Sequence, residues 1–293
     1  MFHRVLVAGI GALGSELVKN LGLLGCESVF LTDADIVEEK NIHRSLLMRD
    51  GVPGTSKVAQ AVDRLRDWFP RTEWQGAPVE IADVEAEQFL RADAIFSCVD
   101  TDLARAEIAV LAARYQLPVC DSGLGGTSTR VGRVSWFPSG DSTACFGCLL
   151  NGKRRAEILS VWESDVHSCW AGSALEQPIW TSTPAMASIV AALQTETAVS
   201  FQEYSFSIQI DLDREPVVEN IQHRRSAGCP FHSQMEGMPF PICTLAECRS
   251  CGQEFSPHKR IAWLRRWGAC PSCGGRDIVV RTSTVKELTG HAL

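Results

Sequence analysis

Short apolar runs alternate with helical patterns along the first half of the chain. The runs are typical of strands that are buried on both faces, and leucines three or four positions apart predict helices between them. The predicted strands cover 5–8, 28–31, 94–99 and 118–121, and the predicted helices after the first include 57–69 and 104–115. Strands that alternate with helices imply a parallel sheet covered on both faces. We therefore predict an α/β fold with a Rossmann-like, doubly wound, mostly parallel sheet.

The pattern changes in the second half of the chain. Residues 151–183 are polar and weakly periodic, so we interpret them as a long crossover loop. A helix is expected over 184–200 and a strand over 203–213. After residue 240 the composition shifts to cysteine, glycine and arginine, which predicts two domains, at 1–240 and 241–293.

Composition and charge narrow the class of protein. The chain has 293 residues and a net charge of −7, which disfavours nucleic-acid binding because phosphate contacts need a basic surface. No apolar run approaches the length of a membrane span. The apolar stretch 5–14 is similar to a signal peptide, but its glycine spacing indicates a nucleotide-binding turn instead. We expect a cytoplasmic protein with no membrane contact.

Three glycines follow the first strand at the spacing of a dinucleotide-binding turn. Gly9, Gly11 and Gly14 lie between a predicted strand and a predicted helix, so backbone N–H groups can approach phosphate. Asp33 ends the second strand, 19 residues after Gly14, where a carboxylate can bind ribose hydroxyls. Taken alone, these residues predict an NAD enzyme.

Three further motifs follow in order along the chain. They read D-A-D-I-V-E-E-K-N-I-H-R over 33–44, G-T-S-K over 54–57 and D-T-D-L-A-R over 100–105. With the glycine motif, they resemble the ThiF/MoeB group of adenylating enzymes, which activate ubiquitin-like proteins. The resemblance covers residues 4–232. It departs from the family at Thr101, which replaces an asparagine, and in lacking the N-terminal helix whose arginine reaches the partner subunit's ATP.

The resemblance implies that ATP and Mg²⁺ are the cofactors and assigns roles at the matching positions. The glycines, Asp33 and Asp35 belong to the nucleotide site, and Asn41 would bind the triphosphate. Arg44 and Lys57 would neutralise the phosphates. Asp100 would hold Mg²⁺, a cation that prefers carboxylate oxygen. Taken singly, each charged side chain is equally typical of a solvated surface.

The twelve cysteines include three C-x-x-C pairs, which in a long α/β chain indicate zinc in a reducing compartment. The family has a structural zinc at two such pairs, and the matching residues here are Cys145, Cys148, Cys229 and His232. The alternative is two independent buried cysteine turns. A Cys₃His set is an accepted tetrahedral site.

A second zinc site is predicted by spacing alone. Cys248 and Cys251 are separated by 18 residues from the pair Cys270 and Cys273, with glycines just after each pair. This spacing is typical of a zinc ribbon. The segment is basic, which suits an acidic protein partner or a nucleic acid.

Cys169 is the expected nucleophile. It falls in the crossover loop, where the family has a cysteine that attacks the acyl-adenylate, and His167 lies two residues before it. The alternative is an ordinary loop thiol, because thiolate reactivity depends on surroundings that a sequence does not reveal.

The resemblance implies adenylation of the C-terminal carboxylate of a ubiquitin-like protein, followed by a thioester on Cys169. The downstream partner is expected to be a conjugating enzyme or a sulfur acceptor, and the chain a homodimer. The compact form and the added ribbon look similar to bacterial members of the family, including those in ubiquitin-like conjugation operons linked to phage defence. Two alternatives stay open here: an NAD-dependent oxidoreductase, and a scaffold that binds a ubiquitin-like tail without chemistry.

Overall fold

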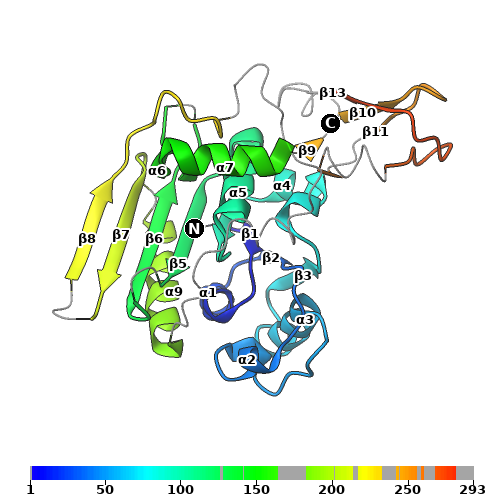
Figure 1. Ribbon diagram of the computed structural model, residues 1–293. Coiled ribbons are helices and arrows are strands. Elements are labelled where there is room, and N and C mark those ends of the chain that lie inside the picture. Colours follow the sequence, from blue (N-terminus) through cyan, green and yellow to red (C-terminus); the bar gives the residue numbers. More distant parts are fainter. Residues whose placement is uncertain are drawn as a thin grey trace.

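The computed structural model contains one large sheet with helices on both faces (Figure 1). The structure describes residues 2–125, 128–140, 142–163, 183–200, 202–213, 217–232, 242–243, 245–255, 259–260 and 268–281. The strands of the large sheet are β1 (Arg4–Ala8), β2 (Ser28–Thr32), β3 (Glu73–Ala77), β4 (Ala94–Ser97), β5 (Val119–Leu124), β6 (Val131–Phe137), β7 (Phe206–Asp211) and β8 (Val217–Gln222). Their order in the sheet is β3-β2-β1-β4-β5-β6-β7-β8.

The first five strands of this order are parallel, and the last three join antiparallel. In β1, Val5 and Val7 pack into one apolar core, whereas Leu6 and Ala8 pack into the other. Four consecutive buried apolar residues, as over Val5 to Ala8, suit a parallel sheet that is buried on both faces. The predicted fold class is confirmed.

Helices form the two outer layers. One core contains side chains of α1 (Ala12–Leu23), α3 (Lys57–Trp68) and α9 (Pro184–Val199). The other contains side chains of α4 (Ala86–Arg91), α5 (Asp102–Tyr115), α6 (Phe146–Leu149) and α7 (Gly152–Glu163). Short turns of helix complete the connections, namely α2 (Glu39–Ile42), η1 (Leu46–Met48) and η2 (Ile81–Asp83).

The expected strands and helices are present within a few residues of their predicted ends. The loop expected over 151–183 is wrong for its first part, because residues 152–163 form α7. This helix is polar along most of its length and buries Ile158 against the α5 side of the sheet. Asn151 accepts a hydrogen bond from the Arg154 N–H at the start of the helix, over 2.9 Å.

The strands after residue 241 pair with one another within the described part of the chain. β10 (Leu245–Cys248) lies between β11 (Glu254–Phe255) and β13 (Ile278–Arg281). β9 (Ile242–Cys243) pairs with β12 (Lys259–Arg260). A domain boundary at 240/241 stays a prediction. Among the described residues, no helix has the length and apolar character needed to cross a membrane.

Candidate nucleotide site and cysteine clusters

The glycine turn follows β1 at the centre of the parallel strands. Gly9 has a φ of +90° and donates its N–H to the Thr32 carbonyl over 2.8 Å. A side chain at Gly9 would lie 2.7 Å from the Cys98 carbonyl oxygen, and one at Gly14 would overlap the backbone of Gly9. Gly11 is the N-cap of α1, and a side chain there would have no atom of the described residues within 4 Å. The turn therefore leaves the N-terminus of α1 open to an anion.

Asp33 is fixed beside this turn by two backbone donors. Its carboxylate accepts the Ile10 N–H over 2.6 Å and the Asp35 N–H over 2.9 Å. Burial raises the pKa of Asp33 above its usual value, and the nearby Lys57 ammonium opposes that rise. Both carboxylate oxygens are thus oriented at the end of β2, where a ribose would lie in a Rossmann-like site.

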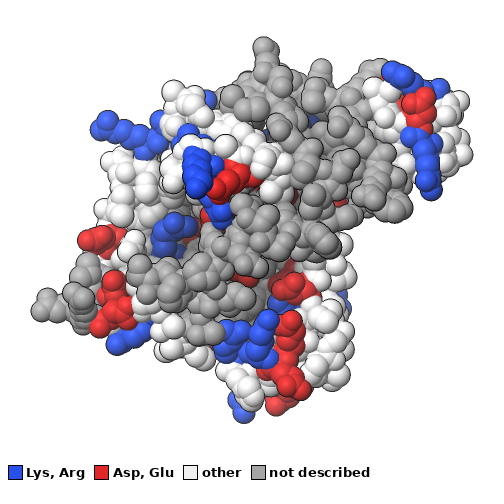
Figure 2. All heavy atoms as spheres, viewed as in Figure 1, with Lys and Arg blue, Asp and Glu red and all other residues white. Residues whose placement is uncertain are grey.

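Lys57 begins α3 and is held against the segment after β2. Its Nζ lies 2.7 Å from the Asp35 carboxylate, and its backbone N–H donates to the Asp35 carbonyl over 3.2 Å. The Gly54 N–H donates to the Val37 carbonyl over 2.9 Å, with a φ of +88° at Gly54. The motif G-T-S-K therefore turns the chain so that the lysine returns to the glycine loop. Basic and acidic side chains lie next to each other over α2 and α3 (Figure 2).

Asn41 and Arg44 lie on or next to the short helix α2. The Asn41 side chain accepts the Glu38 N–H over 2.9 Å, which closes a capping box. The Arg44 Nε donates to the Lys40 carbonyl over 3.0 Å. Asn41 thus has a structural role, and the guanidinium of Arg44 keeps further donors for a ligand.

Two serines tie this segment to the glycine turn. The hydroxyl groups of Ser15, on α1, and Ser45 lie 2.5 Å apart, and the Ser45 hydroxyl also donates to the Gly11 carbonyl over 3.4 Å. Both serines are buried. The contact brings the predicted arginine and the predicted phosphate turn to the same end of the sheet.

Asp100 lies three residues after the end of β4, the parallel neighbour of β1. It is exposed, and its side chain makes no hydrogen bond or ion pair with the residues that the structure describes. Thr101 is the N-cap of α5 and accepts the Ala104 N–H over 3.2 Å, so threonine at this position still caps the helix. Since β1, β2 and β4 are parallel neighbours, Gly9, Asp33 and Asp100 all follow carboxyl ends at one sheet edge.

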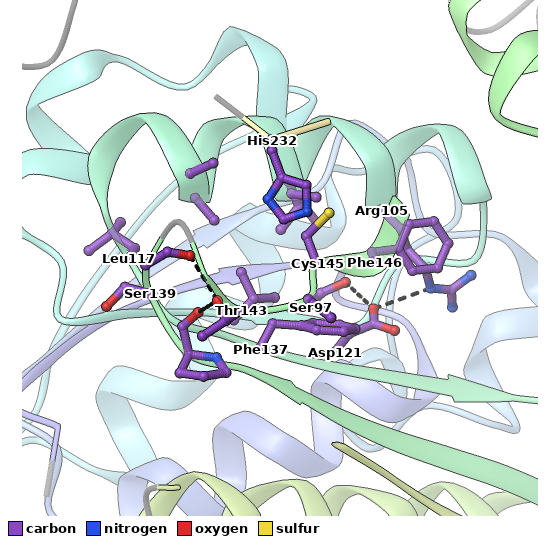
Figure 3. Close-up of a pocket in the computed structure, with 18 residues that line it drawn as sticks. Ser97, Arg105, Leu117, Asp121, Phe137, Ser139, Thr143, Cys145, Phe146 and His232 are labelled. Atoms are coloured by element: carbon purple, nitrogen blue, oxygen red, sulfur yellow. Dashed lines mark hydrogen bonds and ion pairs between the residues drawn. The ribbon is translucent and has the colours of Figure 1, made fainter. Parts of the chain in front are cut away.

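A buried carboxylate on β5 was missed as part of the site. Asp121 is 2% exposed and accepts hydrogen bonds from Ser97 over 2.6 Å, Arg105 over 3.2 Å and Arg133 over 3.4 Å. Figure 3 shows Ser97 and Arg105 reaching Asp121 at one side of a small cavity, with Cys145 and His232 above it. The signal available in the sequence was a charged residue at the end of an apolar strand.

The first cysteine cluster joins two distant segments. Cys145 is the N-cap of α6 and Cys148 lies within this helix, whereas Cys229 and His232 follow β8. The four ligand atoms lie within 4.8 Å of one another. The sulfur atoms of Cys145 and Cys229 are 3.7 Å apart, and the Cys148 sulfur lies 3.0 Å from the His232 Nε2. Hydrogen bonds with Cys145 and Cys229 lower the pKa of the Cys148 thiol. The thiolate form is the one that binds metal.

The second cluster contains Cys248, Cys251, Cys270 and Cys273, again within 4.8 Å. The sulfur pairs Cys248–Cys273 and Cys251–Cys270 are 3.6 and 3.7 Å apart. Zinc–sulfur bonds of about 2.3 Å in a tetrahedron place sulfur atoms about 3.8 Å apart, so both donor sets fit zinc. Each cysteine pair ends in a glycine with positive φ, +73° at Gly252 and +71° at Gly274.

Cys169 and His167, predicted as the nucleophile and its neighbour, lie outside the described residues. The other predicted site residues are described. The structure brings the glycine turn, Asp33, Lys57 and Asp100 to one edge of the sheet, and gathers the eight metal-binding candidates in two separate clusters.

Known proteins are similar to this chain in sequence and in fold. SUMO-activating enzyme subunit uba-2 of Caenorhabditis elegans is 30% identical over 148 residues, which cover 50% of this chain and 25% of that protein. Adenylyltransferase and sulfurtransferase uba4 of Aspergillus terreus is 29% identical over 152 residues, which cover 50% of this chain and 31% of that protein. The match thus spans only about a quarter to a third of these relatives.

A crystal structure of E. coli MccB with ATP is similar in fold. Its TM-score is 0.59 at 16% identity, covering 78% of this chain and 66% of that chain. At this identity the likeness extends to the fold alone. The sequence itself matches the ThiF family over residues 2–231, which is most of the described sheet and its helices. The chain belongs to the ThiF family.

Proposed function

We propose that the chain uses ATP to adenylate the C-terminal carboxylate of a ubiquitin-like protein. The observation that carries the proposal is the joint placement of the glycine turn at the N-terminus of α1, a buried lysine and an exposed aspartate at one sheet edge of a ThiF-family fold. The names of two relatives, a SUMO-activating enzyme subunit and an adenylyltransferase and sulfurtransferase, support the same reaction class.

The nucleotide would bind at the glycine turn. Side chains at Gly9 and Gly14 would collide with the backbone, so the tight turn needs glycine at both positions. The backbone N–H groups of this turn would approach the phosphates. The oriented carboxylate of Asp33 would accept hydrogen bonds from the ribose hydroxyls. Asp35 would act through Lys57, its ion-pair partner, rather than on the nucleotide itself.

The reaction joins two anions, so cations must lower the repulsion. Arg44 and Lys57 would neutralise the triphosphate. Asn41, on the short helix α2 before Arg44, would bind the triphosphate from the same side. Asp100 suits Mg²⁺, because it is an exposed carboxylate without a described partner at the edge where the phosphates would lie. The metal would supply further positive charge at the phosphate oxygens.

The chemical step is a displacement at the α-phosphorus. A carboxylate oxygen of the ubiquitin-like tail would form a bond to this phosphorus, and the bond to the bridging oxygen of pyrophosphate would break. Pyrophosphate leaves with that electron pair, and the tail becomes an acyl-adenylate. The described residues would orient the two anions and stabilise the charge on the departing group.

A thioester on Cys169 would follow the adenylation. The Cys169 thiolate would attack the acyl carbon, and AMP would leave. Cys26, Cys98 and Cys120, which lie outside the clusters, are poor alternatives, because burial raises the pKa of Cys26 to about 11 and of Cys98 to about 12, and raises that of Cys120 as well. The product would pass to a conjugating enzyme or a sulfur acceptor.

Both cysteine clusters would hold structural zinc. The sulfur spacing in each cluster suits a tetrahedral ion, and Cys229 and His232 are almost fully buried. The first ion would join the turn around α6 to the segment after β8. The second would stabilise the short strands after residue 241. A homodimer in the cytoplasm stays a prediction.

The proposal is tested in lysate of the native host, by adding the purified chain with Mg-ATP. We expect a reductant-sensitive adduct on Cys169. The mass of the adduct should identify a small protein that is joined to Cys169 through its C-terminal carboxyl group. Stabilisation of the chain by NAD rather than by Mg-ATP would favour an oxidoreductase. Binding of the partner with neither an adduct nor pyrophosphate exchange would favour a scaffold.

A further inference from the structure

Two consecutive arginines at the start of α7 reach in different directions. Arg154 donates from its Nε to the Asp102 carboxylate over 2.9 Å. Arg155 donates to the carbonyl groups of Gly147 over 2.8 Å and Cys148 over 3.3 Å, at the turn of the first cysteine cluster. The first turn of α7 therefore connects that cluster with the N-terminus of α5.

Asp102 and Arg105 then enclose the turn that contains Asp100. Arg105 donates to the Val99 carbonyl over 2.6 Å, and its guanidinium lies 3.8 Å from the Asp102 carboxylate. Val99 precedes Asp100 and Asp102 follows it by two residues. One guanidinium thus contacts the chain on both sides of the exposed Asp100 side chain, and is itself fixed by Asp121.

These charges are too buried to be ordinary surface pairs. The side chains of Arg105, Asp102 and Arg154 are 9%, 15% and 20% exposed. Partial burial strengthens attraction between charges and lessens its screening by salt. Arg154 also lies 3.0 Å from Glu157, one turn along α7, which limits the directions its guanidinium can take. Acidic and basic side chains lie together over α7 in Figure 2.

Asp102 is not part of the family pattern. The resemblance at 100–105 rests on Asp100 and Arg105. The Asp102 carboxylate instead accepts a hydrogen bond from Arg154, which lies 52 residues later in the chain. The pair is therefore a feature of this chain that the motif alone does not predict.

We propose that Arg154 and Asp102 are positioning residues that, together with Arg105, hold the Asp100 turn in the geometry that accepts Mg²⁺ and ATP. The inference rests on the proposed function, because it gives Asp100 the metal. Arg154 does not touch the nucleotide in this account. It acts by fixing Asp102, which keeps Arg105 directed at the Val99 carbonyl and so limits the movement of Asp100.

The test uses the full chain and a fluorescent ATP analogue titrated at a series of Mg²⁺ concentrations. Asp102→Asn, Arg154→Met and the double variant are compared with wild type. Removing a group that orients a metal ligand typically lowers the affinity for the metal about tenfold or more. Each single variant should therefore raise the half-saturating Mg²⁺ concentration about tenfold. The double variant should be no worse than either single one, because both remove the same contact.

Two controls separate positioning from general damage. Arg91→Met removes an exposed arginine paired with Glu87 on α4 and should leave the Mg²⁺ dependence unchanged. Arg154→Lys keeps the positive charge and should recover part of the Mg²⁺ affinity. Urea unfolding reports whether each variant is folded, and Asp102→Asn, which keeps the side-chain shape, carries the test if Arg154→Met does not fold.

The outcomes are distinct. Folded variants with the Mg²⁺ dependence of wild type would overturn the inference and leave the proposed function intact. A double variant whose half-saturating Mg²⁺ concentration rises by the product of the two single increases would overturn the inference too, since the residues would then act separately. Wild-type chain that binds ATP without any Mg²⁺ dependence, or does not bind it, would instead contradict the proposed function, and the inference with it.

Discussion

The ammonium group of Lys57 lies 2.7 Å from the carboxylate of Asp35, with the lysine side chain 9% exposed and the aspartate 73% exposed. A buried cation is thus paired with a carboxylate that water reaches. An exposed partner can turn away when a stronger anion arrives, whereas the lysine is held by the start of α3. The ammonium group of Lys57 is therefore available to a phosphate group at the proposed site.

Removing the lysine should weaken nucleotide binding, whereas removing the aspartate should not. Lys57→Met should weaken ATP binding about tenfold to a hundredfold, because a charge-assisted hydrogen bond is worth about 1.5–3 kcal/mol. Asp35→Asn should leave binding unchanged or strengthen it, since Lys57 loses a competing anion. Calorimetric titration with Mg-ATP measures both. Equal weakening in the two variants would show that the intact pair, rather than the lysine, is needed.

Asp100→Ala should abolish ATP–pyrophosphate exchange without unfolding the chain. Asp100 is exposed and has no described partner, so its loss should change the free energy of unfolding by about 0.5 kcal/mol or less. Asp63 is an exposed aspartate on α3 and has no role in the proposed metal site. The Asp63→Ala variant is therefore the matched control and should retain exchange. Unchanged exchange in Asp100→Ala would remove this residue from the proposed metal role.

The carboxylate of Asp33 should make stability depend on pH. Its pKa is raised, chiefly by burial, so the folded chain keeps this proton at pH values where the unfolded chain has lost it. The folded state then binds more protons, and its stability falls as pH rises from about 3.9 through the raised pKa. Relative to Asp33→Asn, wild type should therefore gain stability as pH is lowered from neutral.

Urea unfolding of both chains at several pH values measures this difference. Nucleotide affinity should change in the opposite direction, because the ionised carboxylate is the better acceptor for ribose hydroxyls. A stability difference that stays constant from about pH 7 to pH 4 would mean that Asp33 titrates normally.

The two cysteine clusters should bind metal independently. Elemental analysis should find about two zinc ions per chain, and about one in the Cys270→Ser, Cys273→Ser double variant, which should keep nucleotide binding. Cys229→Ser should be far more damaging, with a loss of about 4 kcal/mol or more, because Cys229 and the neighbouring Phe231 are buried in the core beneath α5.

Zinc content is the deciding readout for that prediction. A wild-type chain that is folded, has all its cysteines reduced, and contains no metal would contradict both sites. Loss of nucleotide binding in the Cys270→Ser, Cys273→Ser variant would show that the second cluster supports the sheet domain, and not only the strands after residue 241.

Local sequence signals predicted the centre of the fold well. The runs 5–8 and 28–31 are apolar at nearly every position, and the structure buries β1 and β2 in the middle of a parallel sheet. The same holds for the glycine turn, because only glycine fits the backbone approach at Gly9 and Gly14. Such features depend on neighbours in sequence, so a sequence pattern contains them.

Features that depend on distant partners were not predictable. α7 has a polar sequence and is stabilised by Arg154 and Arg155, whose partners lie on α5 and at the turn around α6. Asp121 is satisfied by Ser97, Arg105 and Arg133 from three other elements. No periodicity along the chain encodes such contacts, which follow from the way the strands and helices pack.

ATP–pyrophosphate exchange tests the central claim most directly. The purified chain is incubated with ATP, Mg²⁺, labelled pyrophosphate and the ubiquitin-like protein recovered from host lysate. The account predicts label in ATP that requires this protein's C-terminal carboxylate and is lost in Asp100→Ala. No label above background, with a partner shown to bind the chain, would contradict adenylation as its function.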